Sequence, residues 1–268
     1  MLLREVEYAR PGSVEEALRL LASNDGARAL AGGQTLVSVM KARAAAPDVL
    51  VDLGKLDELR AISVSGETLT IGAMATYSQI MASSEVEVSR PIVAEVCALI
   101  ADVQVRNRGT IGGNVCSNDP TNHLPPLMVA LEAEFAIIGA GGERTVPAAE
   151  FFLGVYMTAA GPGDLLTEIR IPAGRSDAFE AVTLGADGTC IVSAAASISD
   201  AGVRVALGCV DAVPILVEPA SADEAAVRAA VQGAEFDPAS DVHASAEYRR
   251  HLAGVVAVRA VRKASEQG

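Results

Sequence analysis

The amino-acid sequence predicts an α+β protein, and three observations carry that prediction. Strand and helix patterns alternate over the first 55 residues, pairs of short strands dominate residues 56–175, and a strand hairpin precedes two helical segments in residues 178–268. The length of 268 residues allows two domains. Hydrophobic residues make up 50% of the chain and charged residues 21%, so the chain can bury packed cores and is not expected to be disordered.

The first segment, residues 1–55, predicts a compact β-α-β unit that begins with a short strand. Ser13 and Glu16 form a capping box, in which the hydroxyl and the carboxylate each accept a hydrogen bond from an N–H group at the start of a helix. The pair Gly32-Gly33 lies between a strand and the next helix. The expected elements are a helix over 14–22, a strand over 28–31, a helix from Leu36 that ends by Pro47, and a buried strand over 49–53.

The middle segment, residues 56–175, is rich in short strands. The turn Ser65-Gly66-Glu67 joins two of them as a hairpin, with Gly66 supplying a positive φ. A second glycine turn, Thr110–Asn114, is expected between two helices. The expected elements are strands over 61–64, 68–71, 134–138, 143–146 and 165–171, and helices near 92–100 and 125–131. The polar run Pro172–Asp177 disfavours a helix and predicts a boundary, which gives domains of 1–175, with lobes of about 1–55 and 56–175, and 177–268.

The last segment is expected to form a three-stranded sheet followed by two helices. Strands over 191–198 and 203–210 are joined by a hairpin turn, and helical periodicity covers 224–231 and 246–263. In the last helix one apolar stripe is expected to pack onto the domain core, and Arg249 is among the basic residues largely off that stripe. The stripe consists of Tyr248, Leu252, Val255, Val258 and Val261.

Composition excludes several classes of function. The net charge of −13, from 21 basic and 34 acidic residues, disfavours nucleic-acid binding. Residues 1–7 alternate apolar and charged side chains and lack the apolar run of a signal peptide, and no apolar stretch approaches the roughly 18 residues of a membrane span. We therefore expect a cytoplasmic protein. Aromatic residues are only 3% and Trp is absent, so aliphatic side chains must fill the cores.

The sequence predicts no metal site on this chain. Its four cysteines lie far apart, without the close spacings that ligate zinc or iron–sulfur clusters. Its three histidines show no H-E-x-x-H or H-x-H spacing. The cysteines are expected to be reduced thiols.

The two glycine turns are candidate anion sites. Gly32-Gly33-Gln34-Thr35 opens a helix, where exposed N–H groups and the helix dipole favour a negative charge, and Thr35 is expected to cap that helix. Thr110–Asn114 repeats this chemistry, so the two turns together are suited to the two phosphates of a pyrophosphate. Arg106 or Arg108 would offset the ligand's charge. From the residues alone each turn is also compatible with an ordinary connection, and neither fits the Rossmann or P-loop pattern.

Five blocks of sequence carry a family resemblance over nearly the whole chain. They resemble, in the right order, motifs of the FAD-binding medium subunit of the molybdenum hydroxylases, which include xanthine dehydrogenase and aerobic carbon monoxide dehydrogenase. The resemblance is closest to the carbon monoxide dehydrogenase type. The blocks are Ala31–Leu36, which resembles A-G-G-x-S/T-L; Gln104–Asn114, which resembles Q-x-R-N-x-G-T-I-G-G-N; Asn118-Asp119-Pro120; Gly163–Pro172; and Ser245–Arg250.

The resemblance implies a two-lobed FAD-binding domain of the vanillyl-alcohol-oxidase (PCMH) type, followed by a smaller α+β domain. It implies that FAD is held by Ala31, Gly32, Gly33, Gln34, Thr35 and Leu36, by Thr110, Ile111, Gly112, Gly113 and Asn114, and by Asp119, His123, Leu165 and Leu166. The first two groups would hold the pyrophosphate, Asp119 would lie near the ribose or adenine, and Leu165 or Leu166 would line the cofactor. No catalytic acid or base is assigned.

Three departures from the family pattern concern the flavin. Asn122-His123 replaces a Ser-Asp or Asn-Asp pair, so an imidazole stands where a carboxylate is expected; it would bind the ribose or lie on a surface loop. The segment 179–189 lacks the usual basic and aromatic residues. Cys190 follows it, either as a thiol near the flavin or as a small buried residue.

The function implied by the resemblance is electron transfer in an oxidoreductase. The chain is expected to pass electrons from 2Fe–2S clusters on a small partner subunit through FAD to a terminal acceptor, while a large subunit binds the molybdopterin cofactor, as a dimer of heterotrimers. The isoalloxazine carries the redox chemistry, and the protein binds and tunes it. The alternatives are a stand-alone FAD oxidoreductase that acts on a small organic substrate and a non-enzymatic scaffold that has lost FAD.

Overall fold

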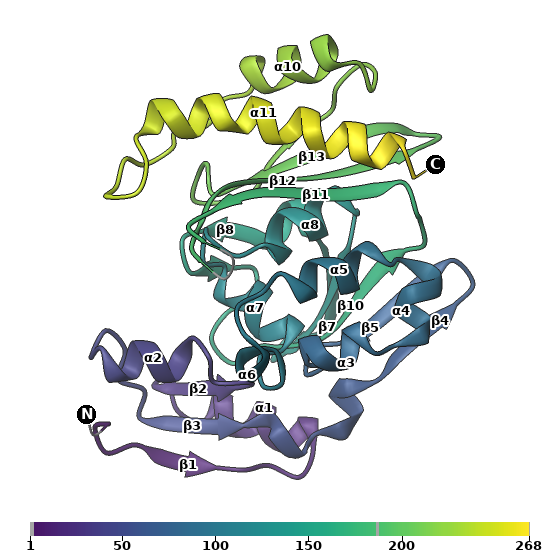
Figure 1. Ribbon diagram of the computed structural model, residues 1–268. Helices are drawn as coiled ribbons and strands as arrows, with labels where there is room; N and C mark the ends of the chain where they lie inside the picture. The colour runs from purple at the N-terminus through teal and green to yellow at the C-terminus, as the bar shows by residue number, and fades with distance from the viewer. Residues whose placement is uncertain (1–2, 186–187, 268) are drawn as a thin grey trace.

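The computed structural model describes residues 3–185 and 188–267, whose elements form three groups (Figure 1). A small N-terminal lobe lies at one end, a middle region follows, and a C-terminal domain capped by two helices lies at the other end (Figure 1). The sheets of these groups have three, five and four strands within the described residues, and a two-stranded hairpin is separate. The mixed sheets and helices confirm the predicted α+β class.

The N-terminal lobe is a parallel three-stranded sheet with strand order β1-β3-β2. Ser13 caps the first helix as predicted, by accepting a hydrogen bond from the N–H of Glu16 at 3.2 Å. The Glu16 carboxylate instead accepts from the N–H of Gly12 at 2.7 Å, one residue before the predicted partner, because the incoming chain brings that group to it. The elements are β1 (Glu7–Ala9), α1 (Val14–Ala22), β2 (Ala27–Leu30), α2 (Leu36–Lys41) and β3 (Val49–Asp52).

The middle region is built on an antiparallel sheet with strand order β4-β5-β10-β6-β7. Its core includes Phe135 and Phe151, whose ring centroids lie 4.2 Å apart, among many aliphatic side chains. The strands are β4 (Ile62–Ser65), β5 (Thr68–Gly72), β6 (Glu134–Gly139), β7 (Gly142–Pro147) and β10 (Leu165–Pro172), and the separate hairpin consists of β8 (Phe152–Gly154) and β9 (Met157–Thr158).

Short helices surround this sheet, and two 3-10 turns lead into it. The turns are η1 (Leu53–Lys55) and η2 (Asp57–Arg60); the helices are α3 (Tyr77–Met81), α4 (Ser84–Ser89), α5 (Ile92–Ala98), α6 (Val103–Arg106), α7 (Ile111–Ser117), α8 (Leu124–Ala130) and α9 (Ala148–Phe151). The prediction of a second glycine turn at Thr110–Asn114 was wrong, because Ile111–Asn114 form the start of α7.

The C-terminal domain contains a four-stranded antiparallel sheet, so the predicted three strands were one too few. The additional strand has only three residues and lies between Pro214 and Pro219, which hides it in the sequence pattern. The elements are β11 (Asp177–Thr183), β12 (Cys190–Ser199), β13 (Gly202–Gly208), β14 (Ile215–Val217), α10 (Glu224–Gly233) and α11 (Ala246–Ser265).

The central strand β12 is buried on both faces because helices cover each of them. Helix α11 packs on one face, and α8 of the middle region packs on the other (Figure 1). Ala195 and Ala206 on neighbouring strands belong to the core of the middle region, whereas Ala194 and Ala196 belong to the core under α11. Small side chains at these positions let helices approach the sheet closely from both sides.

The buried face of α11 differs from the predicted stripe. Leu252 and Val261 are buried as expected, but Tyr248 is 51% exposed. Arg249 is buried, because its guanidinium donates hydrogen bonds to the carbonyl of Ile191 and to the carboxylate of Asp241. The stripe prediction was therefore wrong for these two residues, since periodicity does not register polar acceptors that other elements supply.

Candidate cofactor-binding site

The two glycine segments lie against each other in the structure. A Cβ atom on Gly32 would lie 2.1 Å from the carbonyl oxygen of Arg108 and 2.9 Å from the Cα of Gly109. A Cβ atom on Gly113 would lie 3.6 Å from the Cβ of Ala31. The β2–α2 loop therefore contacts the segment that leads into α7, although about 75 residues of chain separate the two in sequence.

The β2–α2 loop presents unused N–H groups. Gly33 has a φ of +74°, a conformation that glycine adopts without strain, and it turns the chain from β2 toward α2. Within the described part of the chain, the N–H groups of Gly32, Gly33, Gln34 and Thr35 donate no hydrogen bond. Gln34 and Thr35 are exposed. The loop is thus a row of four backbone donors without an internal acceptor.

Thr35 does not cap α2, contrary to the sequence prediction. Its backbone is helical, with φ −87° and ψ −55°, and its side chain makes no capping hydrogen bond. A capping residue needs an extended backbone to bring its oxygen over the next N–H groups. The hydroxyl of Thr35 is consequently available to a ligand.

The N–H groups at the start of α7 are already used within the chain. Thr110 caps this helix, and its side chain accepts from the N–H of Gly113 at 3.1 Å. The neighbouring N–H groups of Ile111, Gly112 and Asn114 donate to the carbonyls of Ala75, Ala73 and Thr110 at 3.0, 2.9 and 3.1 Å, respectively. Of the predicted pyrophosphate segment Thr110–Asn114, only the N–H of Thr110 therefore donates no hydrogen bond to the described residues.

Gly112 and Asn114 have other roles in this segment. A Cβ on Gly112 would lie 2.6 Å from both the Cβ and the carbonyl oxygen of Ala73, so glycine allows α7 to pack against the end of β5. The side-chain amide of Asn114 donates to the hydroxyl of Tyr77 at 3.0 Å, while its Oδ1 is buried without a hydrogen-bond partner. Burial raises the pKa of Tyr77 well above its usual range, so this hydroxyl is neutral.

Sequence reasoning missed Tyr77 and the carbonyls of Ala73 and Ala75. Together with the isolated bridge between Thr76 and Thr110, they hold the start of α7 in place. One local signal was present: Thr76 and Gln79 form a capping box that begins α3. That signal predicts the helix, but it does not predict what the residues before it contact.

Asp119 and His123 both lie in the connection from α7 to α8, residues 118–123. The Asp119 carboxylate accepts hydrogen bonds from the hydroxyl of Tyr156 at 2.8 Å and from Thr121, so it ties the β8–β9 hairpin to this connection. The same contact raises the pKa of Tyr156. The His123 ring packs on Phe179 of β11, with centroids 5.1 Å apart, and its Nδ1 is buried without a hydrogen-bond partner.

Leu165 and Leu166 fill hydrophobic cores. Leu165 belongs to the core of the N-terminal lobe and Leu166 to that of the middle region, because alternate residues of β10 point to opposite faces of the sheet. Their exposures are 3% and 6%. Leu36, at the start of α2, is partly buried.

Arg106 and Arg108, the two arginines of the motif Gln104–Asn114, differ in role. Arg106 donates to the carbonyls of Ile100 and Ala101, which fixes the turn after α5. Arg108 is exposed and makes no ion pair or side-chain hydrogen bond with the described residues, while its backbone carbonyl lies against Gly32. Of these two arginines, Arg108 is the one whose guanidinium is free to meet an anionic ligand beside the glycine segments.

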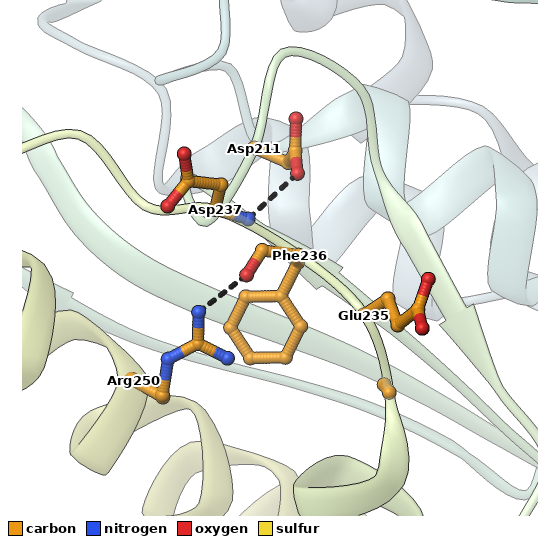
Figure 2. A pocket seen from close by; sticks show the side chains of 6 residues that line it. Asp211, Glu235, Phe236, Asp237 and Arg250 are labelled. Carbon is orange, nitrogen blue, oxygen red and sulfur yellow. Dashed lines mark hydrogen bonds between the residues drawn. The ribbon is translucent and has the colours of Figure 1, made fainter.

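An open surface hollow of about 530 Å³ lies elsewhere, in the C-terminal domain. Figure 2 shows its lining: the guanidinium of Arg250 stacks over the ring of Phe236, 4.6 Å from the centroid, and Asp211 accepts from the N–H of Asp237 at 2.9 Å. None of the predicted cofactor-binding residues lines it. Among residues 3–185 and 188–267, no group of three or more His, Cys, Asp or Glu side chains is placed to hold a metal ion.

No helix in the described ranges is long and apolar enough to span a membrane. The segment 179–189, expected beside the flavin, is described only in part, since Ala186 and Asp187 lie outside the described residues. Thr183, within this segment, pairs with Cys190, which directly follows the segment, across β11 and β12.

Two family models match the chain over almost its whole length. The FAD binding domain in molybdopterin dehydrogenase matches residues 4–174, and the CO dehydrogenase flavoprotein C-terminal domain matches residues 175–264. The carbon monoxide dehydrogenase medium chain of Hydrogenophaga pseudoflava is 37% identical over 98% of this chain and 98% of its own. The glyceraldehyde dehydrogenase medium chain of Sulfolobus acidocaldarius is 31% identical over 97% of this chain and 98% of its own.

The fold is also shared with solved structures. Reconstituted CO dehydrogenase from Oligotropha carboxidovorans superposes with a TM-score of 0.94 at 35% identity, with 100% of both chains covered. This likeness confirms the predicted two-lobed FAD-binding fold of the vanillyl-alcohol-oxidase type with a smaller domain after it. The match to the FAD binding domain in molybdopterin dehydrogenase confirms FAD as the cofactor predicted for this chain. The chain therefore belongs to the family of FAD-binding medium subunits of the molybdenum hydroxylases, the oxidoreductases predicted from its sequence motifs.

Proposed function

We propose that this chain holds FAD between its two glycine segments and passes electrons through it. The observation that carries the proposal is the row of unused N–H groups at Gly32, Gly33, Gln34 and Thr35. A pyrophosphate presents several negatively charged acceptors, and backbone N–H groups without internal partners suit them. The exposed hydroxyl of Thr35 and the guanidinium of Arg108 add two further donors beside this row.

Two buried side-chain atoms without partners also fit a bound cofactor. Asn114 Oδ1 and His123 Nδ1 make no hydrogen bond with any of the described residues, and a buried polar atom without a partner costs roughly 1–3 kcal/mol. A ribityl or ribose hydroxyl has the chemistry to satisfy either. Asp119 is a weaker candidate, because its carboxylate is engaged by Tyr156 and Thr121. We propose that Ala31, Leu36 and the α7 residues contact the cofactor by van der Waals packing.

FAD supplies a ring system that carries one or two electrons, and the chain supplies binding and orientation. We propose that the electrons come from 2Fe–2S clusters of a small partner subunit and go to a terminal acceptor, and that a large partner subunit carries the molybdopterin cofactor. The names of the medium chains from Hydrogenophaga and Sulfolobus support a multi-subunit assembly. A dimer of heterotrimers in the cytoplasm is the form we propose.

The substrate is expected to react on a partner subunit. Relatives of similar identity are named for carbon monoxide and for glyceraldehyde, two molecules with little chemistry in common. If the residues of the medium subunit selected the substrate, this chain would not be expected to be similarly identical to the medium chains of these two enzymes. We assign no catalytic acid or base to this chain.

The chain is proposed to divide into an FAD-binding part of residues 1–175 and a C-terminal domain of residues 177–268. Separate hydrophobic cores support this division: one centres on β1–β3, a second on the five-stranded sheet, and a third lies between the C-terminal sheet and its helices. The core of β1–β3 is built mainly from the lobe of about 1–55, with Leu165 added from β10, and the second core mainly from residues 56–175, with Ala195 and Ala206 added from the C-terminal sheet.

Affinity purification of the tagged chain from its native host tests this function. We expect an iron–sulfur chain and a molybdopterin chain to co-purify, and the flavin absorbance to bleach on anaerobic addition of a substrate of the complex. The isolated, FAD-loaded chain should show electron transfer to artificial acceptors but no turnover of organic substrates. Turnover by the isolated chain would contradict the proposal in favour of a stand-alone oxidoreductase, and a chain that cannot bind FAD would indicate a scaffold.

A further inference from the structure

Two neighbouring residues at the start of α3 hold the segment that leads into α7. The N–H of Tyr77 donates a hydrogen bond to the carbonyl of Gly109 at 3.2 Å. The hydroxyl of Ser78 donates to Asn107 Oδ1 at 2.7 Å. Both acceptors belong to the motif Gln104–Asn114, which contains the second of the two glycine segments. The first turn of α3 therefore supports one side of the candidate cofactor site.

The ring of Tyr77 packs against the backbone of Gly109. A Cβ on Gly109 would lie 2.6 Å from Cε2 of this ring, so only glycine allows the ring to lie there. A Cβ on Gly32 would lie 2.9 Å from the Cα of the same Gly109. Tyr77 is only 4% exposed. Gly109 is thus in contact with a buried ring and with the β2–α2 loop, which carries the unused N–H groups.

The hydroxyl of Tyr77 fixes the side-chain amide of Asn114. It accepts a hydrogen bond from Asn114 Nδ2 at 3.0 Å. Asn114 is only 8% exposed, and its Oδ1 makes no hydrogen bond with the described residues. Because the amide is planar and carries one acceptor and one donor branch, a hydrogen bond at Nδ2 determines where Oδ1 points. A buried acceptor without a partner is therefore held in one orientation.

We infer that Tyr77 is a positioning residue for FAD, an inference that rests on the proposed function. Its hydroxyl holds the Asn114 amide so that Oδ1 accepts a hydrogen bond from a hydroxyl group of the cofactor. Its ring holds Gly109 against the β2–α2 loop. The unpartnered oxygen gains its missing donor when the cofactor binds, so the hydrogen bond contributes to affinity. Tyr77 acts through Asn114 and Gly109 rather than through a contact of its own.

Tyr77→Phe tests the role of the hydroxyl, because it keeps the ring against Gly109 and removes the hydrogen bond to Asn114. Fluorescence titration of the purified full-length chain should give an FAD dissociation constant roughly tenfold above that of wild type. The rise in melting temperature on adding FAD should be correspondingly smaller. The matched control is Tyr248→Phe, since Tyr248 is 51% exposed on α11 and its hydroxyl makes no hydrogen bond with the described residues.

The outcomes distinguish this inference from the proposed function. An FAD affinity in Tyr77→Phe equal to that of wild type and Tyr248→Phe would overturn the positioning role alone. A wild-type chain that binds no FAD would overturn the proposed function.

Titration with ADP identifies which hydroxyl is the donor, because ADP has the ribose and the pyrophosphate but no ribityl chain. If Tyr77→Phe weakens ADP and FAD binding by the same factor, the ribose is the donor. If it weakens FAD binding alone, the ribityl chain is the donor.

A double-mutant cycle with Asn114→Ala separates positioning from a general effect on the fold. Asn114→Ala removes the acceptor and should itself raise the FAD dissociation constant roughly tenfold. Adding Tyr77→Phe should then raise it no further, because the hydroxyl acts through the amide. The same factor in both backgrounds would contradict the inference. If Tyr77→Phe fails to fold, which its melting temperature would reveal, wild-type FAD affinity in Asn114→Ala would still overturn it.

Discussion

Arg90 and Asp177 form a buried ion pair between the middle region and the C-terminal domain. The guanidinium Nη2 donates to Asp177 Oδ1 at 2.7 Å, and Nε lies 2.7 Å from Oδ2. The same guanidinium donates to the carbonyl of Pro172 at 2.7 Å and to the hydroxyl of Ser197 at 2.9 Å. One side chain at the end of α4 therefore holds the last strand of the middle region and two strands of the C-terminal sheet.

Removing one partner of this pair should destabilise the protein. In Asp177→Asn or Arg90→Ala the remaining buried charge loses its counter-ion, which costs about 3–5 kcal/mol and lowers the melting temperature by roughly 10 °C. Calorimetry on the purified chain measures the change. Arg259→Ala, at an exposed position of α11, is the control and should shift stability by less than about 0.5 kcal/mol. Melting temperatures equal to wild type in both buried variants would show that the pair does not join the domains.

Gly32 should tolerate no side chain. A Cβ there would lie 2.1 Å from the carbonyl oxygen of Arg108, which belongs to backbone and has little room to move. Gly32→Ala should therefore separate the glycine segments, abolish FAD retention and lower the melting temperature. Gly141→Ala is the matched control, because a Cβ on Gly141 would meet no heavy atom within 4 Å and its φ is not positive. Full flavin content in Gly32→Ala would place the cofactor elsewhere.

Substitutions of Arg108 and Arg106 should have different effects, because Arg108 is free to bind the ligand whereas Arg106 holds a turn. Arg108→Ala removes an exposed cation beside the glycine segments, so FAD affinity should fall about fivefold, on the order of 1 kcal/mol, with an unchanged melting temperature. Arg106→Ala removes two hydrogen bonds to the turn after α5 and should lower the melting temperature. Fluorescence titration at low and high salt measures the first effect, which salt should weaken. Equal FAD affinity in Arg108→Ala and wild type would exclude Arg108 from the site.

The Asp241–Arg249 pair should stabilise the C-terminal domain in a pH-dependent way. Hydrogen bonds from the N–H groups of His243 and Ala244, and then the Arg249 guanidinium, lower the pKa of Asp241 to about 2. A carboxyl with a depressed pKa in the folded state contributes fully above its unfolded value of about 3.9 and loses that contribution as the pH falls toward 2. The melting temperature of Asp241→Asn should therefore lie below that of wild type at pH 7 and converge with it near pH 2. A difference that stays constant across this range would show that ionisation of Asp241 is irrelevant.

Local signals in the sequence predicted most of the elements, and contacts between distant segments account for the errors. The spacing of apolar residues and the cap at Ser13 identify α1, whose bounds are as predicted. The three residues of β14, between two prolines, are a strand only because β13 pairs with them. Arg249 is buried only because Ile191 and Asp241 supply acceptors.

The same distinction applies to the candidate site. Motifs singled out both glycine segments, and the structure brings them together at Gly32 and Arg108. Which of their N–H groups are free does not follow from the motifs. The N–H groups of Ile111 and Gly112 are taken by the carbonyls of Ala75 and Ala73, which no local pattern links to them. The donors of Gly32–Thr35 have no such acceptor among the described residues, and this difference assigns the two segments different roles.

Equilibrium titration of the purified full-length chain with FAD tests the central claim most directly. Binding is followed by quenching of flavin fluorescence, and the chain is then passed over a desalting column to measure retained cofactor. We predict saturable binding of one FAD per chain, retained on the column by wild type and lost in Gly32→Ala. A correctly folded wild-type chain that binds no FAD, or that binds it equally well without an intact Gly32–Thr35 loop, would contradict the claim that these backbone donors hold the cofactor.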